Sequence, residues 1–494
     1  MTDRSWRVIA ALCAALLLLS TLPLYAISFY NHPYYDDYGF SAESYAVWRE
    51  TGDLGATVAQ AWRTAQTVRQ TWQGTYTGTF LSCLQPGVFG QYWLTGVLLL
   101  TAWLAGLGAL CVQGLRLLRA SRAQTVALAC LALFVATQFL PDPDEAFYWF
   151  NGGVGNSFVY AMIFGSFALL LSMERGAKAW PRAAALFVLF ALLGGGSYGG
   201  GLFVLLAMGA AVLVSFCAKS KRRWLYLALT AWLACCFLYS FTAPGNGVRA
   251  GVVGGSASAV KAVAKALYYG TALAAEYTRL PLMALMLLLA PVAVAFARRT
   301  TFRFRRPLLA LLFGWLLFCA QLCPPLYGGV FLGGGRIQDT YYASWIVLAL
   351  AGECYVLGWA VKRFALTEET VNRFPLTGAF RRGVLALSAC ALLLGCMGCK
   401  NAQDTLYGPQ NLAGAKAALS LISGEAQTYD AEMDAREALL EDETQPVVTL
   451  APLSAVPDIF MKDLLAPDAA YDVRPALCAY YGKEAVLTEG GAAQ

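Results

Sequence analysis

Long apolar runs recur along the whole chain and are separated by polar segments. A helix that spans a membrane needs roughly 20 mostly apolar residues, and eleven runs suit that role. They lie at 7–29, 92–114, 124–140, 154–173, 182–196, 201–217, 224–243, 281–297, 307–323, 342–361 and 383–399. The runs are continuous and rich in Leu and Ala, which favours helices over strands. The pattern predicts an all-α polytopic membrane protein with about 11 transmembrane helices.

Two of these runs leave an alternative open. The fifth and sixth are short and are separated by the glycine-rich stretch from Gly194 to Gly201, so they are either two helices or one broken helix.

The first run follows basic residues, as in a signal peptide, but lacks a small-x-small cleavage site. We expect it to be a retained membrane anchor.

Composition and charge placement agree with this class. Of the 494 residues, 58% are hydrophobic and 13% are charged, against about 25% charged residues in a soluble domain. A cytosolic enzyme, a secreted disulfide scaffold and a nucleic-acid-binding module are therefore excluded. Most Lys and Arg residues fall in loops on the side of the N-terminus, and most acids fall in the other loops. Because cytoplasmic loops carry excess positive charge, we expect the N-terminus inside and the C-terminus outside.

The distribution of the predicted spans divides the chain into two domains. Residues 1–399 form the transmembrane domain, and residues 400–494, which contain no run of spanning length, form a small α/β extracytoplasmic domain. The outer loops of the transmembrane domain are 30–91, 141–153, 244–280 and 324–341.

Local patterns predict further elements in these outer segments. Helices are expected at 41–50 and 54–70, and an amphipathic helix suited to the membrane interface at 256–277. In the C-terminal domain we expect two helices within 411–441, a strand at 446–450 and a closing segment at 471–481.

Adjacent carboxylates begin the first outer loop. Asp36 and Asp37 follow the first apolar run closely and are flanked by tyrosines. Such a pair can act as a general base or a metal ligand, because like charges this close raise one pKa. An exposed loop start with interfacial tyrosines is the alternative interpretation. His32, the only histidine, excludes a metal site built from several histidines.

Basic residues are scarce in the outer loops, which draws attention to Arg249 and Arg336. Each lies in a glycine-rich loop at the end of an apolar run. The planar guanidinium matches phosphate geometry, although anchoring to lipid headgroups is an alternative. Glu353 is the one acid within a predicted span.

Several short motifs occur in order along the chain. They are Asp36-Asp37-Tyr38, Trp72-x-Gly74, Glu145-x-x-x-Trp149, Pro244-Gly245-Asn246-x-x-Arg249 and Ala479-Tyr480-Tyr481-Gly482. Together with the topology, they resemble the GT-C superfamily of polytopic membrane glycosyltransferases. The chain most resembles an uncharacterised bacterial membrane-protein family related to that superfamily. The resemblance covers nearly the whole chain.

The resemblance implies an activity and a location. The protein would transfer a sugar from a polyprenyl-phosphate donor to a cell-envelope glycan or lipid, on the outer face of the bacterial plasma membrane. Its partners would be membrane lipid and the polyprenyl-phosphate sugar, with no nucleic acid. A transporter or flippase of a lipid-linked glycan is the alternative, favoured by the glycine-rich break, and a non-catalytic envelope assembly protein is another. The sugar, the acceptor and the oligomeric state do not follow from the sequence.

The resemblance also implies roles for individual residues. Asp36 or Asp37 would deprotonate the acceptor hydroxyl, and Glu145 would assist as a second carboxylate. The phosphate and substrate contacts would come from Asn246, Arg249, Arg336, Trp72, Tyr148 and Trp149. A divalent cation, Mg or Mn, is left open, with Asp36, Asp37 and Glu145 as its ligands. In such relatives a basic residue is expected at this place in the loop, but here position 75 is Thr75. The resemblance therefore does not imply that this loop binds phosphate.

Overall fold

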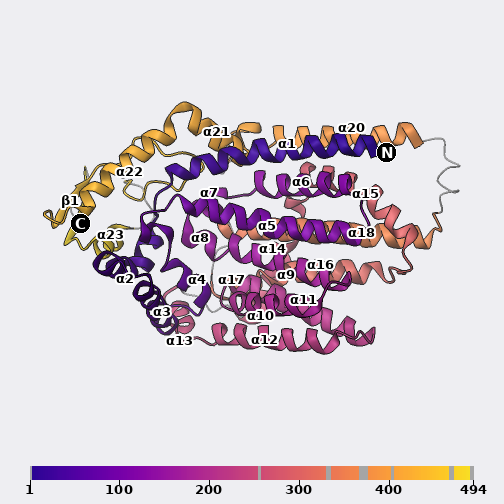
Figure 1. Ribbon diagram of the computed structural model, residues 1–494, viewed down its shortest axis with the longest axis horizontal. Helices are drawn as coiled ribbons and strands as arrows, with labels where there is room; N and C mark the ends of the chain where they lie inside the picture. Colours follow the sequence, from indigo (N-terminus) through magenta and orange to yellow (C-terminus); the bar gives the residue numbers. More distant parts are fainter. Residues whose placement is uncertain are drawn as a thin grey trace.

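Long helices aligned with one axis make up most of the molecule (Figure 1). The computed structural model describes residues 3–253, 258–329, 335–366, 377–401, 405–466 and 472–489. Each of the eleven apolar runs lies on a helix. The helices are α1 (Asp3–Ile27), α5 (Leu94–Leu117), α6 (Arg122–Gln138), α9 (Ser157–Glu174), α10 (Ala179–Gly194), α11 (Tyr198–Cys217), α12 (Arg223–Phe241), α15 (Leu280–Arg299), α16 (Pro307–Ala320), α18 (Arg336–Arg363) and α20 (Thr377–Met397).

Length and apolarity single out a subset of these helices. Among the described residues, seven helical segments are long and apolar enough to cross a membrane, and they involve α1, α5, α9, α11, α12, α15 and α18. The helices α6, α10 and α16 are apolar but shorter, and so is the stretch Arg382–Met397 of α20. The all-α, multi-pass class is therefore confirmed, and the number of eleven spans stays a prediction.

The glycine-rich break is a turn between two helices. α10 ends at Gly194, next to Cys236 of α12, and α11 begins at Tyr198. The Gly195 carbonyl accepts hydrogen bonds from the backbone N–H groups of Thr77 (2.9 Å) and Gly78 (3.4 Å) in α4 (Tyr76–Ser82). The fifth and sixth runs are thus two helices, and their turn holds the start of α4.

One end of the bundle carries the short helices of the first long loop. α2 (Asp36–Thr51) and α3 (Leu54–Thr71) follow the 3₁₀ helix η1 (Ser28–Tyr30), and η2 (Pro86–Phe89) precedes α5. The two expected helices are confirmed, but α2 begins earlier, so Asp36 and Asp37 lie in a helical turn. Figure 1 shows these elements opposite the N-terminus. We call this end, with α2–α4, α13, α22 and α23, the head end.

Five further helices belong to the described part of the membrane domain. They are α7 (Pro143–Phe147), α8 (Phe150–Val154), α13 (Pro244–Val253), α14 (Ala259–Tyr277) and the short α17 (Cys323–Tyr327), which follows α16. α14 is amphipathic as expected, because it buries Ala262, Ala266 and Gly270 and exposes Lys261 and Lys265. Its apolar face packs on α16 and α17. The first two residues of the predicted stretch lie outside the described residues.

The C-terminal segment is a small α/β unit. It contains η3 (Pro409–Asn411), α21 (Ala413–Ser423), α22 (Glu425–Glu441), β1 (Val447–Leu450), α23 (Arg474–Tyr481) and β2 (Ala485–Thr488). The strands are parallel and pair Val447 with Ala485 and Leu450 with Thr488. The two expected helices and the strand are present. The closing segment is a helix followed by a strand that the sequence did not indicate, and Tyr471 lies outside the described residues.

This unit packs tightly on the membrane bundle. α21 lies along α1, and the Gly414 N–H donates to the Gln138 side chain of α6 (2.8 Å). At the head end the rings of Tyr45 and Tyr480 are stacked at 4.0 Å, joining α2 to α23. The C-terminal unit therefore shares its apolar core with the membrane domain.

Candidate functional site

Asp37 is a buried structural carboxylate at the start of α2. Its side chain is fully inaccessible to solvent. One carboxylate oxygen accepts from the Tyr92 hydroxyl (2.5 Å) and the Tyr34 N–H (3.1 Å), and the other accepts from the Asn151 N–H (2.9 Å). Burial raises the pKa of Asp37 to about 7, although the hydrogen bonds oppose the rise. The alternative interpretation of this pair as an exposed loop start is therefore wrong for Asp37.

Asp36 is half-buried and lies within electrostatic reach of two arginines. Its carboxylate accepts a hydrogen bond from the Asn151 side-chain amide (3.1 Å). Burial raises its pKa, and the positive charges of Arg336 and Arg249 oppose that rise. Three charged groups from segments far apart in the sequence thus lie within electrostatic reach of one another. The structure brings together one of the predicted carboxylates and both predicted arginines.

A strained backbone position precedes the two aspartates. Tyr35 has φ 36° and ψ −98°, a combination that non-glycine residues rarely adopt. Such a conformation costs roughly 1–3 kcal/mol and persists only where the surroundings enforce it. Here the Asp37 carboxylate accepts from the Tyr34 N–H (3.1 Å) and the Asp37 N–H donates to the Tyr34 carbonyl (2.8 Å). These bonds turn the chain sharply so that both carboxylates begin α2.

Arg336 is held by Glu145 at the start of α18. The guanidinium forms an ion pair with the Glu145 carboxylate (2.9 Å), which also accepts from the Arg336 backbone N–H (3.1 Å). The guanidinium lies over the Trp149 ring at 4.4 Å. Gly335, with φ 76°, brings the backbone so close to Glu145 that a Cβ atom there would collide with the carboxylate. Glu145 therefore positions Arg336 and partly neutralises it.

Arg249 is bound by neutral groups. It donates to the Gln73 side-chain oxygen and lies 5.6 Å from the centre of the Trp72 ring. Within the described part of the chain, no carboxylate lies within ion-pair distance of Arg249, and burial together with the charge of Arg336 lowers its pKa. A half-buried cation with no ion-pair partner is suited to bind an anionic group.

Asn246 connects the segment that carries Arg249 to the loop after α3. Its amide donates to the carbonyls of Ser240 (3.1 Å) and Phe241 (2.9 Å), and its oxygen accepts from Gly74 N–H (3.0 Å) and the Tyr198 hydroxyl (2.7 Å). Both the nitrogen and the oxygen of the Asn246 side-chain amide are therefore already hydrogen-bonded. The structure therefore gives Asn246 a positioning role, whereas the sequence suggested a substrate contact.

Glycines allow the same two segments to meet. A Cβ atom at Gly74 would collide with the backbone of Ser240, and one at Gly245 would collide with the backbone of Trp72. The Trp72-x-Gly74 and Pro244-Gly245-Asn246 motifs are thus two halves of one close backbone contact. That contact places Trp72 and Gln73 beside Arg249.

The two neighbouring aromatic candidates differ in their surroundings. Tyr148 is buried in the core, donates its hydroxyl to the Leu24 carbonyl (2.8 Å) and packs edge-on against Phe460 (5.2 Å). Its environment is that of a packing residue. Trp149 is also buried, but it contacts Arg336 and Tyr34, and among the described residues its indole N–H has no hydrogen-bond partner. An unpaired buried donor is uncommon, which leaves Trp149 suited to a ligand contact.

Further carboxylates on the second loop and on α18 lie beside the backbone that leads into Arg336. Asp142 accepts from the Gly335 N–H (2.8 Å), and the Asp142 N–H donates to Asp339 (2.9 Å). Burial raises the pKa of Asp144 to about 7, and the charges of Asp142 and Glu145 add to the rise. Burial and the neighbouring carboxylates therefore favour the protonated form of Asp144.

The proposed metal ligands do not converge. In the described ranges, Asp36, Asp37 and Glu145 do not form a group whose ligand atoms approach one another as a shared ion requires. Asp37 accepts three hydrogen bonds and Glu145 binds Arg336, so both are already occupied. The group that does converge contains His32, Asp430 and Asp434.

Several residues that build this site were not singled out from the sequence. Asn151 contacts both aspartates, Tyr92 binds Asp37, and Gln73 binds Arg249. Asn151 stands two residues after Trp149, within the second loop, so the polar residue in an aromatic and glycine-rich stretch was the available signal. Tyr92 and Gln73 carry no such signal, because tyrosine and glutamine are common at membrane interfaces and in loops.

Comparisons with protein-family models, with curated proteins and with solved structures found no match. The resemblance to the GT-C superfamily therefore rests on the motifs and the topology alone.

Proposed function

We propose that the protein is an integral-membrane glycosyltransferase, similar to the GT-C superfamily, that uses a polyprenyl-phosphate-linked sugar. The observation that carries this proposal is the grouping of Asp36 with Arg249 and Arg336 at the head end of the bundle. A lipid-linked donor keeps its tail in the bilayer and its phosphate at the surface. A base and a phosphate-binding cation are therefore needed together where the helices meet the head end.

In the proposed reaction, an acceptor hydroxyl attacks the anomeric carbon of the donor sugar. The bond between that carbon and the phosphate oxygen breaks, and the polyprenyl phosphate leaves with the bonding electrons. Asp36 accepts the hydroxyl proton. A general base works best when its pKa lies near the operating pH, and the raised pKa of Asp36 shifts it in that direction.

Asp36 is the preferred base because Asp37 is enclosed. Asp37 accepts hydrogen bonds on both oxygens and has no contact with solvent, so an acceptor hydroxyl has no route to it. Asp37 instead positions Asp36, through the shared partner Asn151. Glu145 acts through Arg336 in the same way.

Arg249 is assigned to the departing phosphate. Positive charge aimed at the oxygen where negative charge develops lowers the barrier. Arg249 has neutral partners, so its full charge is offered to an anion, whereas Arg336 shares its charge with Glu145. The indole N–H of Trp149 offers a further donor beside Arg336.

The test is sugar transfer from a polyprenyl-phosphate donor in membranes that contain each variant. Asp36→Asn is expected to reduce transfer by roughly 10²–10⁴-fold, the usual range for a general base. Arg249→Lys is also expected to be costly, because the planar fork is lost. Glu50→Gln, an exposed carboxylate on the same helix, serves as the control. Transfer by Asp36→Asn at the rate of the parent refutes the assignment.

We further propose eleven spans, with the N-terminus in the cytoplasm and the head end outside the bacterial plasma membrane. The distribution of Lys and Arg supports this orientation. A reporter fused to the N-terminus that reads an outer location contradicts it.

The glycine-rich break that favoured a transporter is the turn between α10 and α11, so it no longer supports that alternative.

A further inference from the structure

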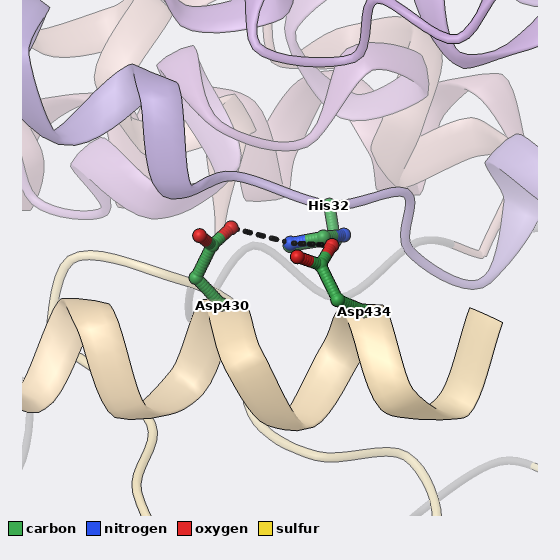
Figure 2. A group of neighbouring side chains, drawn as sticks. All are labelled: His32, Asp430 and Asp434. Carbon is green, nitrogen blue, oxygen red and sulfur yellow. Dashed lines mark hydrogen bonds and ion pairs between the residues drawn. The ribbon is translucent and has the colours of Figure 1, made fainter. Parts of the chain in front are cut away.

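A cluster of metal-binding side chains lies away from Asp36, between the first loop and the C-terminal unit. His32 belongs to the segment between η1 and α2, and Asp430 and Asp434 lie one turn apart on α22 (Figure 2). The His32 Nε2 atom lies 2.9 Å from an Asp430 oxygen and 3.9 Å from an Asp434 oxygen. The three ligand atoms all lie within 4.8 Å of one another.

The local structure orients all three side chains toward one point. Residues four apart on a helix share a face, and Figure 2 shows both carboxylates directed at the imidazole. The His32 ring packs edge-on against Tyr429 at 5.8 Å. The side chain of His32 is 11% exposed, that of Asp430 is 31% exposed and that of Asp434 is 68% exposed. The cluster is thus anchored on one side and open to solvent on the other.

The charges in this cluster are unbalanced. Glu437, one further turn along α22, also lies within electrostatic reach of His32. Three carboxylates therefore face a single imidazole, which carries at most one positive charge. Arg436 does not neutralise them, because its guanidinium binds both oxygens of Asp463 (3.0 and 2.9 Å) and the Ala451 carbonyl. A divalent cation would balance this charge.

We propose that His32, Asp430 and Asp434 bind a divalent first-row transition metal ion, with Zn²⁺ as the expected ion. One imidazole nitrogen and two carboxylate oxygens match the ligands that zinc prefers, and the solvent-exposed side leaves a position for water. Ligand atoms around tetrahedral zinc lie about 3.4 Å apart, given metal–ligand distances of about 2.1 Å. The distances of 2.9 and 3.9 Å from the His32 Nε2 atom to the oxygens of Asp430 and Asp434 lie on either side of that value.

The ion would fasten the C-terminal unit to the segment that leads into α2. His32 lies four residues before Asp36 in the chain, so the metal would fix the approach to the candidate base without taking part in the reaction. The proposal does not depend on the glycosyltransferase activity, because it concerns binding and stability only.

The experiment uses the full-length protein in detergent, purified without a histidine tag and treated with a chelator. His32 is the only histidine, so protein labelled with ¹⁵N-histidine reports one imidazole by NMR. Addition of Zn²⁺ is expected to shift the His32 ring resonances, to bind one ion per chain at this site and to raise the unfolding temperature. This readout also separates the site from the cysteines, which contain no imidazole.

Matched variants test the two carboxylates. Asp434→Asn, at an exposed position that tolerates change, and Asp430→Asn are each expected to weaken the Zn²⁺-dependent shift of His32 at least about tenfold. Asp458→Asn, an exposed carboxylate in the same unit, should leave it unchanged. If Zn²⁺ leaves the His32 resonances unmoved, or if both α22 variants respond as the parent does, the contact is an ordinary ion pair and the proposal is refuted.

Discussion

At the scale of single residues, the adjacent aspartates have different tasks. Asp37 is enclosed by three hydrogen-bond donors, whereas Asp36 faces two arginines. A sequence pattern cannot separate them, because the donors come from positions that are distant along the chain. Asn151 lies 114 residues from Asp37, and only the folded structure brings the two together.

This difference predicts that Asp37→Asn and Asp36→Asn lower the stability of the protein to different extents. Asp37→Asn replaces one accepting oxygen with an NH₂ group and leaves a buried donor without an acceptor, which costs about 1–3 kcal/mol. We expect a lower unfolding temperature for Asp37→Asn, measured by thermal unfolding in detergent. Asp36→Asn should change stability much less, because Asp36 is only half-buried. Equal stability of Asp37→Asn and the parent contradicts the structural role of Asp37.

The raised pKa of Asp144 predicts a pH dependence of stability. Its pKa is about 7 in the folded protein, against an ordinary value of 3.8. Between these values the folded state binds more protons than the unfolded state, so this group lowers the free energy of unfolding as the pH rises from about 4 to about 7. Asp144→Asn removes the titration.

The measurement for Asp144 is the unfolding temperature of variant and parent between pH 4 and pH 8. As the pH rises through this window, the unfolding temperature of Asp144→Asn should increase relative to that of the parent. Above the window the difference between the two unfolding temperatures should stay constant. Comparison with the parent at each pH cancels the contribution of the other carboxylates. A difference that is constant with pH shows that Asp144 does not gain protons on folding.

At the scale of elements, the apolar runs predicted the long helices well, because burial in a membrane demands about 20 consecutive apolar residues. The short elements were harder. β2 spans four residues and pairs with a strand almost forty residues earlier, so its own sequence contains little signal. The start of α2 was placed too late, because the strained backbone of Tyr35 gives no pattern in the sequence.

The close contact of the loop after α3 with the end of α12 and the start of α13 yields a prediction at this scale. Gly74→Ala places a Cβ atom against the Ser240 backbone, and we expect a loss of about 1–3 kcal/mol, as for other overpacked sites. The measurement is thermal unfolding. Gly247→Ala is the matched control, because a Cβ atom at Gly247 meets nothing within 4 Å. Equal losses for both variants would show that the contact is not tight.

At the scale of the whole molecule, the head end is a single structure built from segments that lie far apart in the sequence. The C-terminal domain was predicted from its composition, and its small size indicated that it packs on the loops of the bundle; the structure shows which elements make that contact. Ala413 and Ala417 of α21 belong to the core that contains the membrane helices, and Tyr480 of α23 packs on α2. A composition boundary near Lys400 is therefore not a folding boundary.

This arrangement predicts that residues 400–494 do not fold alone. A segment of this size is near the lower limit for an independent core, and here part of that core belongs to the bundle. Circular dichroism and NMR of the isolated segment should show little stable structure. Co-production with residues 1–399 should restore a folded complex that purifies together. A cooperative unfolding transition of the isolated segment would contradict the shared core.

The stacking of Tyr45 on Tyr480 also has a consequence for the timing of biosynthesis. α2 leaves the ribosome long before its partner α23, because the two helices lie far apart in the sequence. The intervening 420 or so residues require roughly 20–80 s of translation at 5–20 residues per second. Throughout that interval the segment that carries Asp36 lacks its contacts with α23. A nascent chain that stops anywhere before Arg474 therefore never completes the head end, however well its membrane helices insert.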